Sequence, residues 1–121
     1  MEDGGSLPLR PVLRIDFPQA ERLGRGKIAL LEQIAVTGSI SAAGREMGMS
    51  YRRAWLLVDA INTMFAMPAV ELQRGGKQGG GARLTPFGEE LIARFRRMEQ
   101  TLAESLVADL QWLEQSRAKH G

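Results

Sequence analysis

A short helix, a glycine and a second helix in the middle of the chain limit its fold more than any other feature. Residues 41–47 predict a short helix, Gly48 ends it, and Ser50 begins a longer helix that runs to about Phe65. Two helices joined by a tight turn that contains glycine are typical of a helix-turn-helix. In such motifs the second helix, here residues 50–65, lies in the major groove of DNA.

The flanking segments predict a mainly α fold with a small β-hairpin. Residues 10–17 alternate apolar and charged side chains beside two prolines, as an edge strand does, and residues 23–37 repeat apolar side chains at helical spacing. Residues 70–74 and 82–84 predict two strands around a tip, residues 75–81, in which five of seven positions are glycine. This order of elements predicts a winged helix-turn-helix whose wing is the hairpin.

The C-terminal third predicts one long amphipathic helix of about 28 residues, which Thr85 caps and Pro86 begins. An average helix in globular proteins has about 11–12 residues. A domain of about 80 residues cannot cover so long an apolar stripe, so we expect a second copy to cover the remainder in a homodimer. The expected interface residues are Leu91, Phe95, Met98, Leu102, Leu106, Leu110 and Leu113. The alternative is a helix that packs entirely on its own domain.

These elements divide the chain into four parts. We expect a loose arm over residues 1–9, the winged helix-turn-helix over 10–85, the dimerisation helix over 86–116 and a frayed tail over 117–121. Two copies joined through the long helix would present their recognition helices to half-sites about 34 Å apart.

The composition excludes several classes of protein. The chain has 121 residues and no cysteine, which excludes disulfides, thiolate metal sites and a cysteine nucleophile. The N-terminus shows no signal peptide, and no stretch approaches the roughly 18 apolar residues that span a membrane, so we expect a cytoplasmic protein with no membrane partner. The single histidine, His120, is next to last, and Glu89 and Glu90 suit the start of a helix. We expect no enzyme activity, no metal site and no cofactor, because no cluster of convergent catalytic or metal-ligating residues is evident.

Charge is distributed unevenly along a chain whose net charge is +2. Residues 27–97 carry ten basic and six acidic side chains, whereas residues 98–121 carry two basic and four acidic ones. A basic middle segment suits a surface that binds phosphates, and the acidic end should point away from that surface. The alternative is ordinary variation of a protein surface.

Candidate DNA contacts cluster in the first turn of the recognition helix. They are Ser50, Tyr51, Arg52 and Arg53. Arginine pairs bidentately with guanine or holds a phosphate, and tyrosine reaches a phosphate or stacks. Tyr51 as a partly buried residue stays open as an alternative, and Trp55, one turn later, is expected in the core or as a packing anchor.

Two serines are candidates for phosphate contacts. Ser41 and Ser50 each lie at a helix N-terminus, where free N–H groups and the helix dipole favour a phosphate oxygen. Either serine could instead only cap its helix. Ser39 and Ser41 both stay open as the cap of the short helix.

The glycine-rich hairpin carries the second group of candidate contacts. Glycine has no Cβ, so such a tip approaches a phosphate backbone or a minor groove closely. The candidates in or beside the tip are Arg74, Lys77, Gln78 and Arg83. The alternative is a flexible hairpin with solvated charges. A nucleotide site is not expected, because the glycine spacing around Lys77 fits neither phosphate-binding motif.

The run from Lys27 to Leu91 resembles the N-terminal DNA-binding domain of the ModE-type molybdate-responsive transcriptional regulators. The matching pieces are LEQIA from Leu31, GSIS from Gly38, GMSY from Gly48, Ala54-Trp55, the glycine tip with Lys77, and Leu84-Thr85 with Gly88. The helix-turn-helix and the Leu-Thr-Pro-x-Gly closure are also similar to LysR-type regulators. The resemblance implies a winged-helix dimer that binds an operator through Ser41, Ser50, Tyr51, Arg52, Arg53 and the Arg74–Arg83 hairpin.

Full regulators of this type carry C-terminal oxyanion-binding domains, whereas this chain stops at Gly121. Molybdate binding is therefore not carried over: no molybdate site is evident, and the chain is either a natural single-domain form or a truncated one. A natural form would need another signal, a partner such as a separate effector protein or the transcription machinery, or constitutive binding. Two further hypotheses stay open, a protein-interaction module without specific DNA binding and an oxyanion site at the dimer interface.

Overall fold

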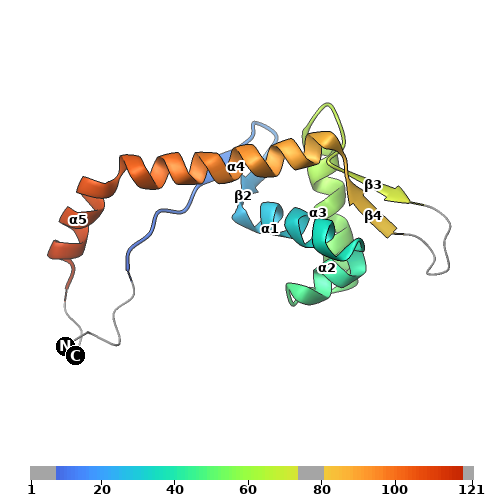
Figure 1. The fold of residues 1–121 in the computed structure, drawn as a ribbon, viewed down its shortest axis with the longest axis horizontal. Helices are drawn as coiled ribbons and strands as arrows, with labels where there is room; N and C mark the ends of the chain where they lie inside the picture. The colour runs from blue at the N-terminus through green and yellow to red at the C-terminus, as the bar shows by residue number, and fades with distance from the viewer. Residues whose placement is uncertain (1–7, 74–80, 119–121) are drawn as a thin grey trace.

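The computed structural model describes residues 8–73 and 81–118. Within these residues the chain forms helices and two antiparallel two-stranded sheets (Figure 1). In chain order the elements are β1 (Arg14–Asp16), β2 (Arg22–Gly24), α1 (Arg25–Thr37), α2 (Ile40–Glu46), α3 (Tyr51–Met64), β3 (Val70–Gln73), β4 (Gly81–Leu84), α4 (Pro86–Ser105) and α5 (Val107–Ser116). The predicted mainly helical fold with a small hairpin is confirmed. None of the helices in the described ranges is long and apolar enough to cross a membrane.

A second hairpin, formed by β1 and β2, was not predicted from the sequence. β1 occupies only the end of the strand expected over residues 10–17 and pairs antiparallel with β2. The turn between them closes through a hydrogen bond from the Phe17 N–H to the Glu21 carbonyl oxygen (2.7 Å). Because Leu23 belongs to β2, α1 begins at Arg25 and not at residue 23. A strand of three residues is too short to show an alternating pattern of its own.

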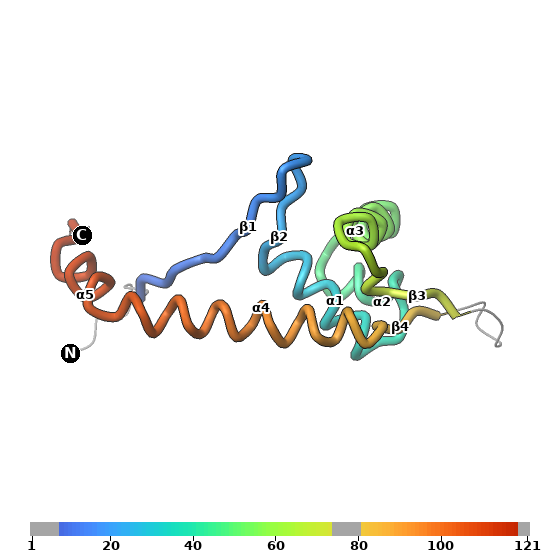
Figure 2. The backbone as a smooth tube through the Cα atoms, turned by 90° about the horizontal axis from the view of Figure 1, so that it is seen from above, coloured from blue at the N-terminus to red at the C-terminus, as the bar shows by residue number. Residues whose placement is uncertain are grey.

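One apolar core is built around α1. This helix contacts α2, α3, α4 and β4, so it is the central element of the domain (Figure 2). The largest fully buried side chains come from α1, α3 and α4, and they are Ile28, Leu30, Leu31, Ile34, Ile61 and Phe95. The apolar residues that predicted α1 and α3 at helical spacing therefore face a common interior.

α2 and α3 form the predicted pair of helices around a tight turn. Ser39 caps α2 and Ser50 caps α3, because each side-chain oxygen accepts a hydrogen bond from a backbone N–H three residues later (3.0 and 3.1 Å). Gly48 in the turn has a left-handed backbone (φ 69°), which glycine adopts without strain. Gly44 of α2 lies against Ala54 of α3, which lets the two helices approach closely.

Asn62 and Thr85 hold the base of the β3–β4 hairpin. The Asn62 amide donates to the Val70 carbonyl oxygen (2.9 Å) and accepts from the N–H groups of Ala69 and Val70 (2.8 and 3.1 Å). The Thr85 hydroxyl donates to the Pro68 carbonyl oxygen (2.7 Å) and accepts from a backbone N–H in the first turn of α4 (3.0 Å). These bonds fix α3, the hairpin and the start of α4 relative to one another.

The C-terminal segment is two helices and not the single long helix that the sequence predicts. α4 ends at Ser105, Leu106 leaves the α-helical backbone region (φ −107°, ψ 9°), and α5 begins at Val107. α4 runs away from the domain, α5 turns off its far end, and the β3–β4 hairpin lies at the opposite end of the molecule (Figures 1 and 2). The apolar spacing continues across Leu106, so the pattern does not reveal the break.

The first two residues of the predicted dimer stripe belong to the core of their own domain. Leu91 is 8% exposed and Phe95 is 0% exposed. Side chains with so little accessible surface have almost none to offer a partner, so we correct both residues from interface to core positions. From Met98 to the end of α5, no residue of the described helices is buried.

Candidate nucleic-acid interface

The first turn of α3 exposes two arginines beside a capped helix N-terminus. The Ser50 hydroxyl accepts a hydrogen bond from the Arg53 N–H (3.1 Å), and no acidic residue lies in this turn. Arg52 and Arg53 are exposed, and their guanidinium groups form no ion pair or hydrogen bond with any residue that the structure describes. Two unpaired cations at the positive end of a helix dipole attract anions such as phosphate.

Tyr51 and Trp55 have different surroundings on α3. Their rings meet edge to face, with centroids 6.1 Å apart and an interplanar angle of 72°. Trp55 is partly buried against the core, whereas Tyr51 is 60% exposed. Trp55 is thus a packing residue that supports the ring of Tyr51, and Tyr51 itself is largely exposed.

Ser41 lies within the first turn of α2, and Ser39 takes the cap position instead. The Ser41 hydroxyl accepts a hydrogen bond from Nη1 of Arg45 (3.1 Å). Arg45 is exposed, and the sequence interpretation missed it as a candidate contact. Its position four residues after Ser41, on the same face of a helix, is the signal that could have identified it.

Arg83 is the hairpin candidate that falls within the described residues. It is exposed on β4 and forms an ion pair (3.3 Å) with Glu71, its partner across the hairpin on β3. An exposed pair of this kind contributes about 0–1 kcal/mol, so a phosphate could replace Glu71 at small cost. Arg74, Lys77 and Gln78 lie outside the described residues.

The candidate contacts and the exposed apolar side chains of α5 lie at opposite ends of the molecule. α2, α3 and the β3–β4 hairpin lie together at one end of α4, and α5 lies at the other (Figure 1). The apolar side chains at the α5 end include Val107, Trp112 and Leu113, which are 52%, 65% and 47% exposed. A ligand bound at Arg52 and Arg53 would therefore not compete with a partner bound at α5.

No family model matches the chain. The chain is 52% identical over 85 residues to the molybdenum-pterin-binding protein MopB of Rhodobacter capsulatus, which is 70% of this chain and 32% of that protein. It is 37% identical over 110 residues to the molybdenum transport protein ModE of Herbaspirillum seropedicae, which is 91% of this chain and 41% of that protein. It is 40% identical over 74 residues to the DNA-binding transcriptional dual regulator ModE of Escherichia coli K12, which is 61% of this chain and 28% of that protein.

The chain is a homologue of the ModE regulators and of the molybdenum-pterin-binding proteins. The resemblance to ModE-type regulators inferred from Lys27 to Leu91 agrees with this finding. The chain spans 28 to 41% of the length of these three relatives.

Proposed function

We propose that this ModE homologue is a winged helix-turn-helix transcriptional regulator that binds specific sequences of double-stranded DNA as a homodimer. α3 is the recognition helix and enters the major groove, while the hairpin over residues 74–83 contacts the backbone or the minor groove. One observation carries the proposal: Arg52 and Arg53 are exposed and unpaired among the described residues, in the first turn of a capped helix that follows a glycine turn.

The arginines supply both kinds of contact that a DNA site needs. A guanidinium group donates two hydrogen bonds to O6 and N7 of guanine, or it holds a phosphate, so Arg52 and Arg53 serve sequence reading and anchoring. Tyr51 adds a hydroxyl that reaches a phosphate. Ser41 and Arg45 on α2 provide a hydroxyl and a cation for the flanking backbone.

A second copy of the chain covers the apolar side chains beyond the domain. Met98, Val107, Trp112 and Leu113 are each 38% exposed or more. Three half-buried leucines lie on the same segment, at Leu102, Leu106 and Leu110. Several exposed apolar side chains on one segment suit an interaction site, and self-association with two-fold symmetry is the simplest way to cover them.

The names of the relatives connect the regulated genes to molybdenum. Two of the three relatives described above carry molybdenum in their names. We therefore propose that the target genes serve the uptake or use of molybdenum and that the protein acts in the cytoplasm, where the DNA is. The proposal includes no enzyme activity and assigns no oxyanion site to the described residues, and a separate effector protein or the transcription machinery is proposed as a further partner.

Selection of bound duplexes from a random pool, followed by affinity measurements across a salt series, tests the proposed function. The expected motif is an inverted repeat, because a two-fold dimer reads two half-sites. The logarithm of the affinity should fall by about 0.9 for each neutralised phosphate per tenfold rise in salt. If the protein shows no affinity for DNA at low salt, the proposal fails and a protein-interaction module becomes the better explanation.

A further inference from the structure

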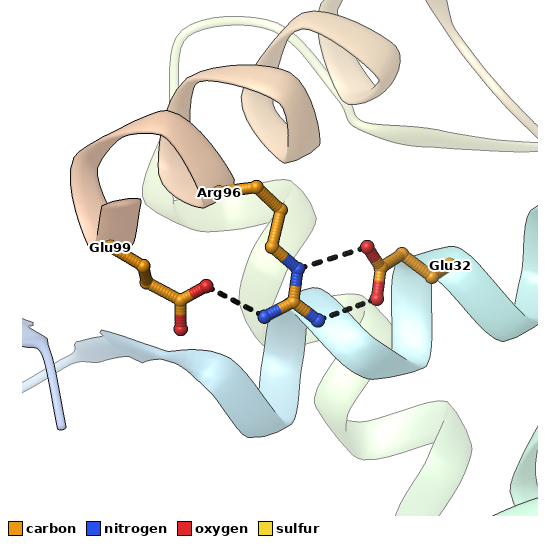
Figure 3. Close-up of polar contacts among 3 residues, drawn as sticks. All are labelled: Glu32, Arg96 and Glu99. Atoms are coloured by element: carbon orange, nitrogen blue, oxygen red, sulfur yellow. Dashed lines mark hydrogen bonds and ion pairs between the residues drawn. The ribbon is translucent and has the colours of Figure 1, made fainter. Parts of the chain in front are cut away.

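Arg96 connects α4 to α1 where α4 leaves the domain. Its Nε and Nη2 atoms donate to the two carboxylate oxygens of Glu32 on α1 (3.0 and 2.6 Å), and its Nη1 atom donates to Glu99 one turn later on α4 (2.8 Å) (Figure 3). A bidentate pair between arginine and a carboxylate fixes the relative orientation of the two side chains as well as their distance. The pair therefore constrains the angle between α1 and α4.

No residue of α4 beyond this pair is fully enclosed by apolar packing. Phe95 is fully buried, whereas Met98 is 38% exposed and no described residue later in α4 is buried. The N-terminal segment around Leu13 lines a shallow groove with Leu102, and no hydrogen bond links this described segment to α4. The Arg96–Glu32 pair is thus the outermost polar connection between α4 and the domain core in the described ranges.

We call the part of α4 that follows Arg96, residues 97–105, the lever, because a rotation at Arg96 displaces its far end. Nine residues follow Arg96 before α4 ends at Ser105, a length of about 14 Å at 1.5 Å per residue. A rotation of about 14° at Arg96 would move one end of this lever by about 3.4 Å relative to the other, which is the axial distance between neighbouring base pairs. A small change in the angle at Arg96 would therefore shift the two domains of a dimer, relative to each other, by about the length of one base-pair step.

We infer that the Arg96–Glu32 pair sets the distance between the two half-sites that the dimer accepts. The inference rests on the proposed function, because it needs a dimer joined beyond Arg96 and a recognition helix on each domain. Arg96 and Glu32 are positioning residues: they lie away from the candidate DNA contacts and act through the angle between domain and lever. A fixed angle between α1 and α4 restricts the dimer to one distance between half-sites, whereas a variable angle lets it bind half-sites at several distances.

The test measures the affinity of the dimer for duplexes in which two copies of the selected half-site are separated by different numbers of base pairs. Glu32→Gln removes the charge and the bidentate geometry of the pair between α1 and α4 and leaves Arg96 paired with Glu99. Glu99→Gln is the matched control, because the same chemical change removes only a contact within α4. We expect the wild type and Glu99→Gln to prefer one spacing by about tenfold over spacings one base pair longer or shorter, and Glu32→Gln to lower this ratio at least about threefold.

Affinity for an isolated half-site separates positioning from a general loss of structure, and it should be unchanged in Glu32→Gln. Arg96→Lys is the second variant, because it keeps the charge and loses the bidentate geometry, so its spacing preference should also broaden. A wild-type spacing profile in both Glu32→Gln and Arg96→Lys overturns the inference, as does equal broadening in Glu99→Gln. If the wild type binds no selected duplex, the proposed function fails instead, so the two failures are distinct.

Discussion

Gly44 of α2 lies so close to Ala54 of α3 that a Cβ atom on residue 44 would stand 2.9 Å from the Ala54 Cβ. Ala54 is fully buried, and Met49 lies 3.5 Å from the same position, so the neighbouring atoms have little room to move. The angle at which α3 leaves α2 therefore depends on the missing side chain of Gly44. That angle also determines where Arg52 and Arg53 project.

Gly44→Ala should lower the free energy of unfolding by about 1–3 kcal/mol, because the added methyl group overpacks the contact between α2 and α3. It should also weaken DNA binding, since α3 must tilt. Gly26→Ala is the control: a Cβ on residue 26, in the first turn of α1, meets nothing within 4 Å and should stabilise the fold by about 0.4–1 kcal/mol. Denaturant titration measures both, and equal stabilities would contradict the prediction.

Asn62→Leu should cost about 2–4 kcal/mol of stability, because it leaves the N–H groups of Ala69 and Val70 and the Val70 carbonyl oxygen without their partner. Thr63→Ala is the neighbouring control. Its exposed hydroxyl bonds only to carbonyl oxygens of its own helix, so the change should stay within about 0.5 kcal/mol. The midpoints of urea unfolding compare the two variants, and similar midpoints would show that Asn62 does not hold the hairpin.

Arg52→Ala and Arg53→Ala should each weaken binding to the selected duplex by about 1–3 kcal/mol if the side chain reads a base. Loss of a base contact relaxes specificity at one position of the motif. Loss of a phosphate contact weakens binding to all sequences and lowers the salt slope by about 0.9. Arg94→Ala is the control, because Arg94 lies on α4 and pairs with Glu90. Fluorescence anisotropy measures the affinities, and wild-type binding by both α3 variants would remove the assignment.

Phe95 and Leu113 should respond differently although both belong to the predicted apolar stripe. Phe95→Ala should lower the free energy of unfolding by about 3–5 kcal/mol, because it opens a cavity in the core. Leu113→Asp should leave the fold intact and shift the dimer toward monomer, because it places a charge on exposed apolar surface. Gln111→Asp, an equal change of charge at an exposed polar position of α5, is the control. Sedimentation over a dilution series measures the mass of the assembly, and a mass unchanged from the wild type for Leu113→Asp would speak against this interface.

Stability at low pH should report on the Arg96–Glu32 pair. The hydrogen bond from Arg96 lowers the pKa of Glu32 below its ordinary value of 4.5, against the opposite effect of burial. Because the folded carboxylate binds protons less readily than the unfolded one, its contribution is present above about pH 4.5 and is lost as pH falls through the lower folded pKa. The pKa of Arg96 is raised by the same contacts, so Arg96 stays charged in this range.

We therefore expect the stability difference between the wild type and Glu32→Gln to shrink as pH is lowered from neutral through the lowered pKa of Glu32. The difference should be small at neutral pH, because both side chains are more than a third exposed and solvent screens their interaction. Thermal unfolding at several pH values measures it. A difference that stays constant over this range would mean that Glu32 does not contribute through its charge.

The candidate contacts on α3 were predictable because their signals are local. Ser50 as a cap, Gly48 in the turn and the arginines of the next turn all lie within six residues of one another. The occupant of the α2 cap was not predictable in the same way, since Ser39 and Ser41 both have the right chemistry. The ion pair of Arg83 with Glu71 depends on the register of two strands, which the sequence pattern alone left open.

By itself the sequence determined the helices of the central motif, the Ser50 cap of α3 and the strands of the β3–β4 hairpin, because glycine conformation, capping and apolar spacing act over a few residues. Only the tertiary structure decided which part of the C-terminal stripe is core. Leu91 and Phe95 belong to the same run of three- and four-residue apolar spacing as Leu110 and Leu113, yet α1 lies beneath only the first part of α4. The pairing of Arg96 with Glu32, across 64 residues of chain, exists because α4 packs across α1, and no local pattern records that contact.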